Sequence, residues 1–191
     1  MEVLGAYERT LVWTGQRVAG VRPDDLDHPT PCTDWDVRAL LAHIVAGIWF
    51  FKALAAGEPV DDLMRSLSDL VGDDPFASYN EAARAGLAAW RGEGALDRSC
   101  RLPMGERPGR EALAIHQADL LIHGWDLAEA TYQDATIEPE LATVALETER
   151  WFVQPEMRGP KRAYAAARSE SAARDDEERL LALVGRSASW R

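Results

Sequence analysis

The residue types that could do chemistry gather in one predicted helix of this 191-residue chain, at residues 111–132. At about 100° per residue, His116, Asp119 and His123 fall within about 60° of one another and so share one face of that helix. Asp119 and His123 stand one turn apart, which brings their Cβ atoms to about 5 to 6 Å. Carboxylates and imidazoles are common ligands of divalent metals, so this spacing predicts that the two residues bind one ion together.

A third ligand is expected from His43, on the apolar helix predicted to face the first. Two histidines and one carboxylate leave at least one coordination position open, which is typical of catalytic rather than structural sites for zinc or a similar ion. His116 fits the same ion less easily, because it stands two turns, about 10.5 Å along the axis, from His123. From the spacing alone an alternative stays open, in which the histidines are hydrogen-bonded core residues and Asp119 lies on the surface.

Helices must position these residues, and helical periodicity accounts for most of the chain. Apolar residues recur at helical spacing in seven segments, residues 2–20, 34–56, 61–71, 76–90, 111–132, 140–152 and 175–184. Thr33 is expected to cap the second helix together with Asp36, and Gly57 to end it. Residues 91–110 indicate an irregular loop with a short extended piece, and no run alternates over a whole sheet. The predicted fold class is therefore all-α, a four-helix bundle of long antiparallel helices with short extra helices.

Composition limits the domain organisation and the classes of partner. With 47% hydrophobic and 28% charged residues and no internal repeat, residues 1–191 are expected to form a single domain. The 21 basic and 32 acidic residues give a net charge of −11, which disfavours nucleic acid and anionic membrane surfaces. Residues 39–57 are nearly long enough to span a membrane, but His43 and Lys52 interrupt them, so a buried core helix is expected.

Cysteine usage and motif content narrow the chemistry further. Cys32 and Cys100 are too few for a disulfide scaffold and lack the spacing of a zinc knuckle, which fits a reducing cytoplasm. The sequence has no phosphate-binding glycine loop, no nucleophile elbow and no Cys-x-x-Cys pair. It therefore argues against nucleotide hydrolases, hydrolases of the Ser/His/Asp type and zinc fingers, and any reaction is expected at the metal.

Three segments carry a family resemblance. They are residues 30–47 (TPCTDWDVRALLAHIVAG), 111–131 (EALAIHQADLLIHGWDLAEAT) and 178–190 (ERLLALVGRSASW). They resemble the DinB-like metal-binding proteins, in the branch similar to the N-terminal domain of mycothiol-dependent maleylpyruvate isomerase. The resemblance implies a four-helix bundle that holds a divalent metal, commonly zinc or nickel, through His43, Asp119 and His123. The middle ligand is a histidine in many relatives and a glutamate in the isomerase, so the shorter Asp119 implies an ion that lies closer to this helix or binds more weakly. The isomerase also has a further C-terminal domain.

Several other residues have two interpretations each. His116 either assists the metal from beside the site, as an outer partner or proton carrier, or packs in the core. Asp126 either orients a ligand histidine or lies on the helix surface. Cys32 is expected to be a small buried residue, and the basic stretch 158–174 either meets an anionic substrate or is solvated. Core or pocket-wall positions are expected for three tryptophans, Trp35, Trp49 and Trp125.

The resemblance and the open coordination position together imply a metal-dependent enzyme. Its ion, zinc first and nickel second, would bind a low-molecular-weight thiol, mycothiol by resemblance, for transfer to, or isomerisation of, a small electrophilic substrate. Two alternatives remain open: a hydrolase that uses metal-activated water, and a non-catalytic protein that binds a metal or small ligand. The expected partners are small molecules, with neither nucleic acid nor membrane, and the expected assembly is a monomer or homodimer.

Overall fold

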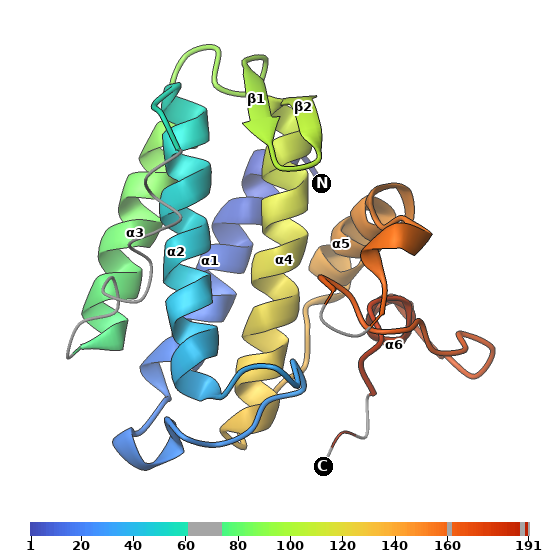
Figure 1. Ribbon diagram of the computed structural model, residues 1–191. Helices are drawn as coiled ribbons and strands as arrows, with labels where there is room; N and C mark the ends of the chain where they lie inside the picture. The colour runs from blue at the N-terminus through green and yellow to red at the C-terminus, as the bar shows by residue number, and fades with distance from the viewer. Residues whose placement is uncertain (61–73, 160–161, 188–189, 191) are drawn as a thin grey trace.

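The computed structural model describes residues 1–60, 74–159, 162–187 and 190, and these form a helical bundle with two further helices at its side (Figure 1). The helices are α1 (Val3–Ala19), α2 (Val37–Ala56), α3 (Pro75–Trp90), α4 (Gly109–Ala130), α5 (Pro139–Phe152) and α6 (Asp176–Leu183), with 3-10 turns at Pro23–Asp25 and Pro155–Met157. The first four form the bundle, α5 packs beside α4, and α6 packs on α5. The all-α fold class is confirmed. The helix expected at residues 61–71 lies outside the described residues.

The direction of the helices differs in part from the prediction. Gln117 on α4 donates to Thr10 on α1, and the carbonyl of Leu120 accepts from Thr14. A residue further along α1 thus contacts a residue further along α4. Helices α1 and α4 are therefore parallel, and Figure 1 shows α2 and α3 running the other way. The expectation of antiparallel helices is wrong for the pairs α1–α4 and α2–α3, because helical periodicity marks the buried face of a helix but not its direction.

The start of α2 also differs from the prediction. Asp36 alone is the N-cap residue, and its carboxylate accepts from the backbone N–H three residues later at 2.8 Å. Thr33 lies before the helix because residues 30–35 fold as a turn, in which the Thr30 hydroxyl contacts two backbone carbonyls at 3.0 and 2.9 Å. The predicted Thr33 cap is thus wrong. Gly57 ends the helix as expected, in the left-handed conformation with φ of 72°.

A β-hairpin occupies part of the segment expected to be an irregular loop. Strand β1 (Ser99–Leu102) pairs antiparallel with β2 (Gly105–Pro108), and Leu102 lies opposite Gly105. A short extended piece was expected here, but two strands of four residues each are too short to show a recognisable alternation. The hairpin lies at the N-terminal end of α4 (Figure 1), so its turn can contribute to a site between α2 and α4.

Helix α4 is central to the molecule and is buried on almost every side. Of its 22 residues, 17 are buried. One apolar cluster lies inside the bundle and includes Leu40, Leu113 and Leu120, and a second joins α4 to α5 and α6 and includes Trp125 and Leu141. The buried polar residues of α4, which are His116, Gln117, His123 and Asp126, are therefore held away from water, where an unpaired charge is costly.

Helix α2 is long and apolar enough to cross a membrane by length and composition alone. In this structure 61% of the apolar window is buried inside the protein, and Leu40, Leu41 and Ile48 are fully enclosed. It is therefore a core helix, as its interruption by His43 and Lys52 predicted.

Candidate metal centre

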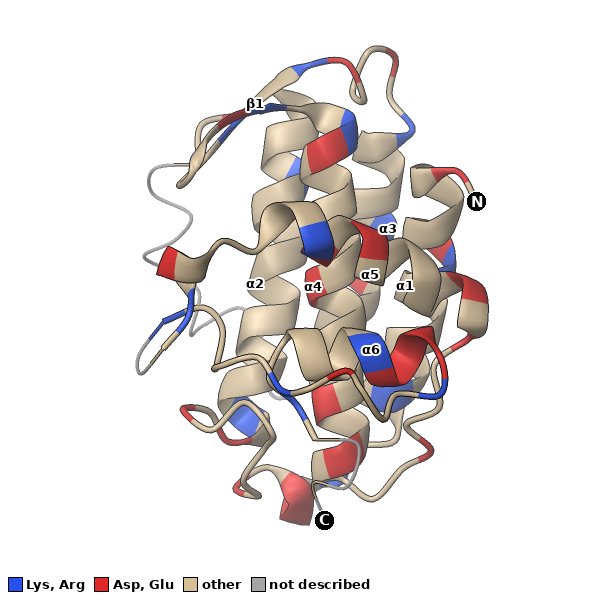
Figure 2. Ribbon diagram, turned by 90° about the vertical axis from the view of Figure 1, so that its right-hand side faces the viewer, with Lys and Arg blue, Asp and Glu red and all other residues tan. Residues whose placement is uncertain are grey.

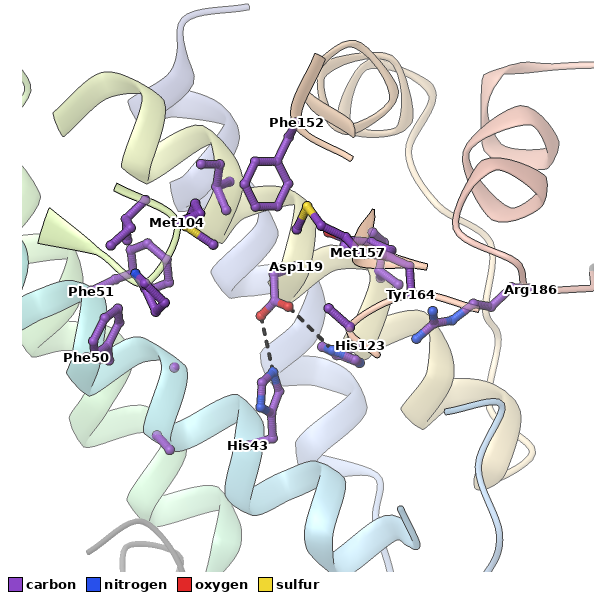
Figure 3. Close-up of a pocket in the computed structure, with 17 residues that line it drawn as sticks. His43, Phe50, Phe51, Met104, Asp119, His123, Phe152, Met157, Tyr164 and Arg186 are labelled. Atoms are coloured by element: carbon purple, nitrogen blue, oxygen red, sulfur yellow. Dashed lines mark ion pairs between the residues drawn. The ribbon is translucent and has the colours of Figure 1, made fainter. Parts of the chain in front are cut away.

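His43 on α2 and Asp119 and His123 on α4 converge at one point between the two helices (Figure 3). The Nε2 atoms of both histidines lie 3.4 Å from the Asp119 carboxylate, His43 facing Oδ2 and His123 facing Oδ1. The two imidazole rings meet edge to face, with centroids 4.7 Å apart. The fold thus brings together the three residues that were predicted as metal ligands.

These separations fit the ligand shell of a small divalent ion. Ligand atoms bound at about 2.1 Å in tetrahedral geometry stand about 3.4 Å from one another, and the three donor atoms here all lie within 4.8 Å of each other. Nε2 of His43 is buried and has no hydrogen-bond partner among the described residues. A buried ring nitrogen ordinarily has a partner, and a metal ion at this point would supply one. The residues present therefore fit a divalent metal.

The charges of the site favour a cation. Burial by itself would raise the pKa of Asp119, but His123 and His43 outweigh it and hold that pKa well below its usual value. Burial would likewise lower the pKa of His123, yet Asp119 and Asp126 outweigh it and raise that pKa to about 9. Without metal, His123 is thus protonated between two carboxylates, and a bound cation would replace the positive charge of that proton.

Asp126 and Arg186 hold His123 from the side away from the metal position. Asp126 is fully buried, and its Oδ2 accepts from Nδ1 of His123 at 3.0 Å. Arg186, which follows α6, donates to both oxygens of the same carboxylate at 3.1 and 2.7 Å. Asp126 therefore orients His123, and the alternative of a surface carboxylate is wrong. A carboxylate on Nδ1 leaves Nε2 of the ring directed at the metal position.

Sequence reasoning missed Arg186. It lies in the tail segment 178–190 that carries part of the family resemblance, but its spacing does not show that the tail returns to α4. Its third guanidinium nitrogen, Nη1, donates to the carbonyl of Val184 at 3.1 Å. The signal that could have found Arg186 is charge, because a carboxylate buried on an apolar helix, such as Asp126, needs a cationic partner.

Aromatic rings close one side of the site. The Trp35 ring, from the segment before α2, lies 4.5 Å from the His43 ring and 5.5 Å from the His123 ring, measured between centroids. Trp35 is partly buried against the bundle core, which is one of its two expected positions, and it contacts the rings of both ligand candidates. Trp125 is a core residue, and Trp49 is partly buried against the bundle core.

His116 lies deeper in the bundle than the three metal-ligand candidates. Its ring stacks on Phe51 with centroids 4.3 Å apart and planes within 4°, and it lies 5.2 Å from the ring of Tyr7. Burial lowers the pKa of His116 to about 4, so the ring is neutral at physiological pH. These contacts are those of a core histidine. A role of His116 toward the metal stays a prediction.

Cys32 lies beside His123 and forms a second group of metal-ligand type with His123 and Asp126, with ligand atoms within 4.8 Å of one another. Arg186 already donates to both oxygens of Asp126, so this group offers a cation no free carboxylate. Burial raises the pKa of the Cys32 thiol to about 11, so it keeps its proton at neutral pH. Cys32 is partly rather than fully buried, which corrects its predicted position.

A cavity of about 250 Å³ opens beside the metal-ligand candidates, and His43, Asp119 and His123 form part of its wall (Figure 3). Most of the remaining wall is apolar, with Tyr164 and Arg186 as the other polar members. The site therefore has both components that a reaction centre needs, a place for an ion and a space for a small molecule.

The basic stretch 158–174 contributes Ala163 and Tyr164 to the wall of this cavity, but none of its described arginines lines that wall. Arg162 and Arg168 are exposed, and Arg174 pairs with Glu178. Figure 2 shows basic and acidic segments mixed over the face formed by α5 and α6. The structure therefore favours the solvated interpretation of this stretch.

Comparison with known proteins finds relatives in sequence. A sequence model described as the mycothiol maleylpyruvate isomerase N-terminal domain matches residues 14–128. That range contains His43, Asp119 and His123. An uncharacterized protein of Mycobacterium tuberculosis, found in two strains, is 32% identical over 187 residues, which cover 98% of this chain and 99% of the relative.

Solved structures share the fold. The crystal structure of the mycothiol-dependent maleylpyruvate isomerase matches with a TM-score of 0.60 at 18% identity, and a mutant form of it matches with a TM-score of 0.58 at 18% identity. The match covers 78% of this chain and 66% of the isomerase, so the chain spans slightly less than two thirds of that protein's length. Identity this low establishes the DinB-like helical fold alone, whereas the sequence model establishes the family. The chain belongs to the mycothiol maleylpyruvate isomerase N-terminal domain family.

Proposed function

We propose that this protein is a divalent-metal-dependent enzyme that uses mycothiol, a low-molecular-weight thiol, for transfer to, or isomerisation of, a small electrophilic substrate. One observation carries the proposal. Three side chains of metal-ligand type converge beside a cavity, in a chain of a family named after a mycothiol-dependent isomerase. Zinc is the first metal of the proposal, because two histidines and a carboxylate suit it, and nickel, which the family resemblance implies, is the second.

The residues around the site would have separate roles in such an enzyme. A divalent ion bound there supplies Lewis acidity, which lowers the pKa of a coordinating thiol so that the thiol binds as thiolate. Asp126 holds the proton at Nδ1 of His123 and keeps its Nε2 available as a ligand atom. Trp35 packs against both imidazole rings and restricts their movement on that side. The cavity offers the electrophile a place next to the open coordination position.

The metal is tested by its stoichiometry. Protein purified without chelator should contain about one divalent ion per chain, because three ligands of these types suit one open site. His43→Ala should lose most of that metal, as should Asp119→Ala and His123→Ala. His28→Ala is the matched control, because His28 lies outside the site with Nδ1 on the carbonyl of Ala130 at 3.3 Å. Elemental analysis that finds undiminished metal in His43→Ala would remove His43 from the ligand set.

The thiol is tested in cobalt-substituted protein. Mycothiol should produce a sulfur-to-metal charge-transfer band that Asp119→Ala lacks, and its binding should release a proton and strengthen with rising pH until hydroxide competes. A spectrum that responds to carboxylates or phosphates but to no thiol would favour the metal-water hydrolase. A spectrum that responds to nothing would favour a non-catalytic binding protein.

We propose further that residues 1–191 form one domain that acts in the cytoplasm on small molecules, as a monomer or homodimer, without nucleic acid or a membrane. Support for one domain comes from α4, which belongs to both apolar clusters and so joins the bundle to α5 and α6. A single cooperative unfolding transition is expected, and light scattering would give the assembly state.

A further inference from the structure

The wall of the cavity is apolar over most of its extent. Phe50 and Phe51 come from α2, Met104 from the turn of the hairpin, Ile115 from α4, Phe152 from the end of α5 and Met157 from the segment after it. Figure 3 shows Met104, Phe152 and Met157 on the upper side of Asp119, and Phe50 and Phe51 to its left. Thioether and aromatic side chains of this kind adapt to apolar ligands of varied shape.

Positive charge in this wall is already neutralised. Arg186 is the one arginine or lysine among the described residues that line the cavity. Its Nε and Nη2 donate to Asp126 and its Nη1 donates to the carbonyl of Val184, so each guanidinium nitrogen has a partner. The nearby guanidinium of Arg158 is not part of the wall, and its Nη1 donates to the carbonyl of Ala165 at 3.2 Å.

Negative charge, by contrast, is close to the cavity. Asp119 lines it directly, and the pKa of this carboxyl group is held well below its usual value by His123 and His43. A divalent ion that holds Asp119 and a thiolate has its two positive charges balanced by two negative ones. An anionic substrate in this cavity would therefore meet no unpaired cation among the described residues of the wall, and burying it there would be costly.

We propose that the electrophile is an uncharged, largely apolar molecule and not a carboxylic acid. The reaction in this inference rests on the proposed function, whereas the polarity of the cavity does not depend on that function. In the thiol addition, the sulfur forms a bond to carbon, the π bond of an activated carbon–carbon double bond breaks, and one proton adds to the neighbouring carbon. The thiol supplies both the sulfur and, through solvent, the proton, so no oxidant or reductant is needed. The isomerase in the comparison is named for a pyruvate derivative, which carries a carboxylate, so the two proteins would differ in substrate class.

Binding is tested first, with an unreactive pair of ligands. Methyl 3-benzoylpropanoate and its free acid share one skeleton and differ in a single methyl group and in the negative charge that esterification removes. Each is titrated against a neutral fluorescent probe, N-phenyl-1-naphthylamine, bound to the purified protein in the presence of mycothiol. The ester should displace the probe at a concentration at least about tenfold lower than the acid, because the acid must leave its carboxylate unpaired. Equal or tighter binding of the acid would overturn the proposal.

A charge introduced into the cavity should reverse the preference. Met104 lies in the hairpin turn and is 45% exposed, so it tolerates replacement without loss of core packing. Met104→Arg should bind the acid about tenfold more tightly than the native protein does, whereas the matched Met104→Gln should not. An unchanged preference in Met104→Arg, with circular dichroism showing an intact fold, would contradict the assigned cavity.

Turnover separates this inference from the proposed function. Methyl 3-benzoylacrylate and its free acid are the reactive pair, and each rate is divided by the rate of the uncatalysed addition of mycothiol. The ester should show the larger ratio by about tenfold. If the protein binds no metal and does not respond to the thiol, but still binds the ester more tightly than the acid, the proposed function is wrong and the cavity inference holds. Faster enzymatic addition to the acid would end the cavity inference and uphold the proposed function.

Discussion

Asp126 and Arg186 show how single residues can decide the behaviour of the site. Both are buried, Asp126 completely and Arg186 to all but 8% of its surface, and they form a two-point ion pair behind His123. Removal of one partner from a buried pair leaves the other charge uncompensated, and such changes cost about 3–5 kcal/mol. Loss of either residue alone is therefore expected to destabilise the protein as well as to release the ring of His123.

Asp126→Asn should destabilise the protein by about 3–5 kcal/mol and weaken metal binding about 10- to 100-fold. The double variant Asp126→Asn, Arg186→Gln should lose less stability than the sum of the two single variants, because no unpaired charge remains. Its metal affinity should stay as low as that of Asp126→Asn. Urea unfolding and competitive metal titration measure the two quantities. Strict additivity of the two stability losses would show that the pair is not coupled.

At the scale of elements, the approach of α1 to α4 depends on Gly124. A Cβ atom built at this position would lie 2.7 Å from both the Thr14 hydroxyl oxygen and the Trp13 ring. Gly124 thus leaves no room for a side chain between two parallel helices, next to His123. A side chain there would push the helices apart or move the Trp13 ring.

Gly124→Ala should destabilise the protein by about 1–3 kcal/mol, since overpacking outweighs the gain in helix propensity. Gly5→Ala is the matched control in α1, because its nearest neighbour, a side-chain atom of Met1, lies at 3.9 Å, an ordinary contact distance. That control should be neutral or stabilise by up to about 1 kcal/mol. Thermal unfolding of the two variants gives the comparison, and a Gly124→Ala protein as stable as the native one would show that the interface adapts.

The elements that the sequence predicted are those with strong local signals. Apolar periodicity located α1, α2, α3, α4, α5 and α6 to within a few residues, and Gly57 marked the end of α2 through its left-handed conformation. Asp36 replaced Thr33 as the cap because a turn at residues 30–35 forms hydrogen bonds that periodicity does not reveal. Helix direction and the strand pairing of the hairpin depend on contacts between distant segments, which no local pattern encodes.

The candidate site was predictable in part for the same reason. Asp119 and His123 lie one turn apart on a single helix, so their spacing alone places them together. His43 is on another helix, so no spacing rule links it to the other two, and it was expected only from its place on the facing helix, with support from the family resemblance. Arg186 approaches His123 from a segment far along the chain, because it stands 60 residues after Asp126 in the sequence. The tail's return to α4 depends on tertiary packing, which spacing does not encode.

At the scale of the whole molecule, Glu149 links stability to pH. It lies on α5 against the bundle, is 1% exposed, and neither of its carboxyl oxygens has a hydrogen-bond partner among the described residues. Burial raises the pKa of Glu149 from 4.5 to about 7, against smaller lowering effects of Tyr164, Arg186 and Arg158. Glu149 is therefore protonated in the folded protein at pH values where it is ionised in the unfolded chain.

The sign of the effect follows from the protons bound in each state. Between pH 4.5 and about 7 the folded protein holds a proton on Glu149 that the unfolded chain has released, so stability falls as pH rises through this window. The rise in pKa corresponds to about 3 kcal/mol once pH exceeds 7.

Glu149→Gln, which is neutral at every pH, should match the native protein near pH 4.5 and be up to about 3 kcal/mol more stable at pH 8. Because His123 and the other titrating groups are present in both proteins, their effects cancel in the difference. Urea unfolding of both proteins from pH 5 to 8 gives this difference, and a gap that stays constant over that range would show that Glu149 is ionised in the folded state.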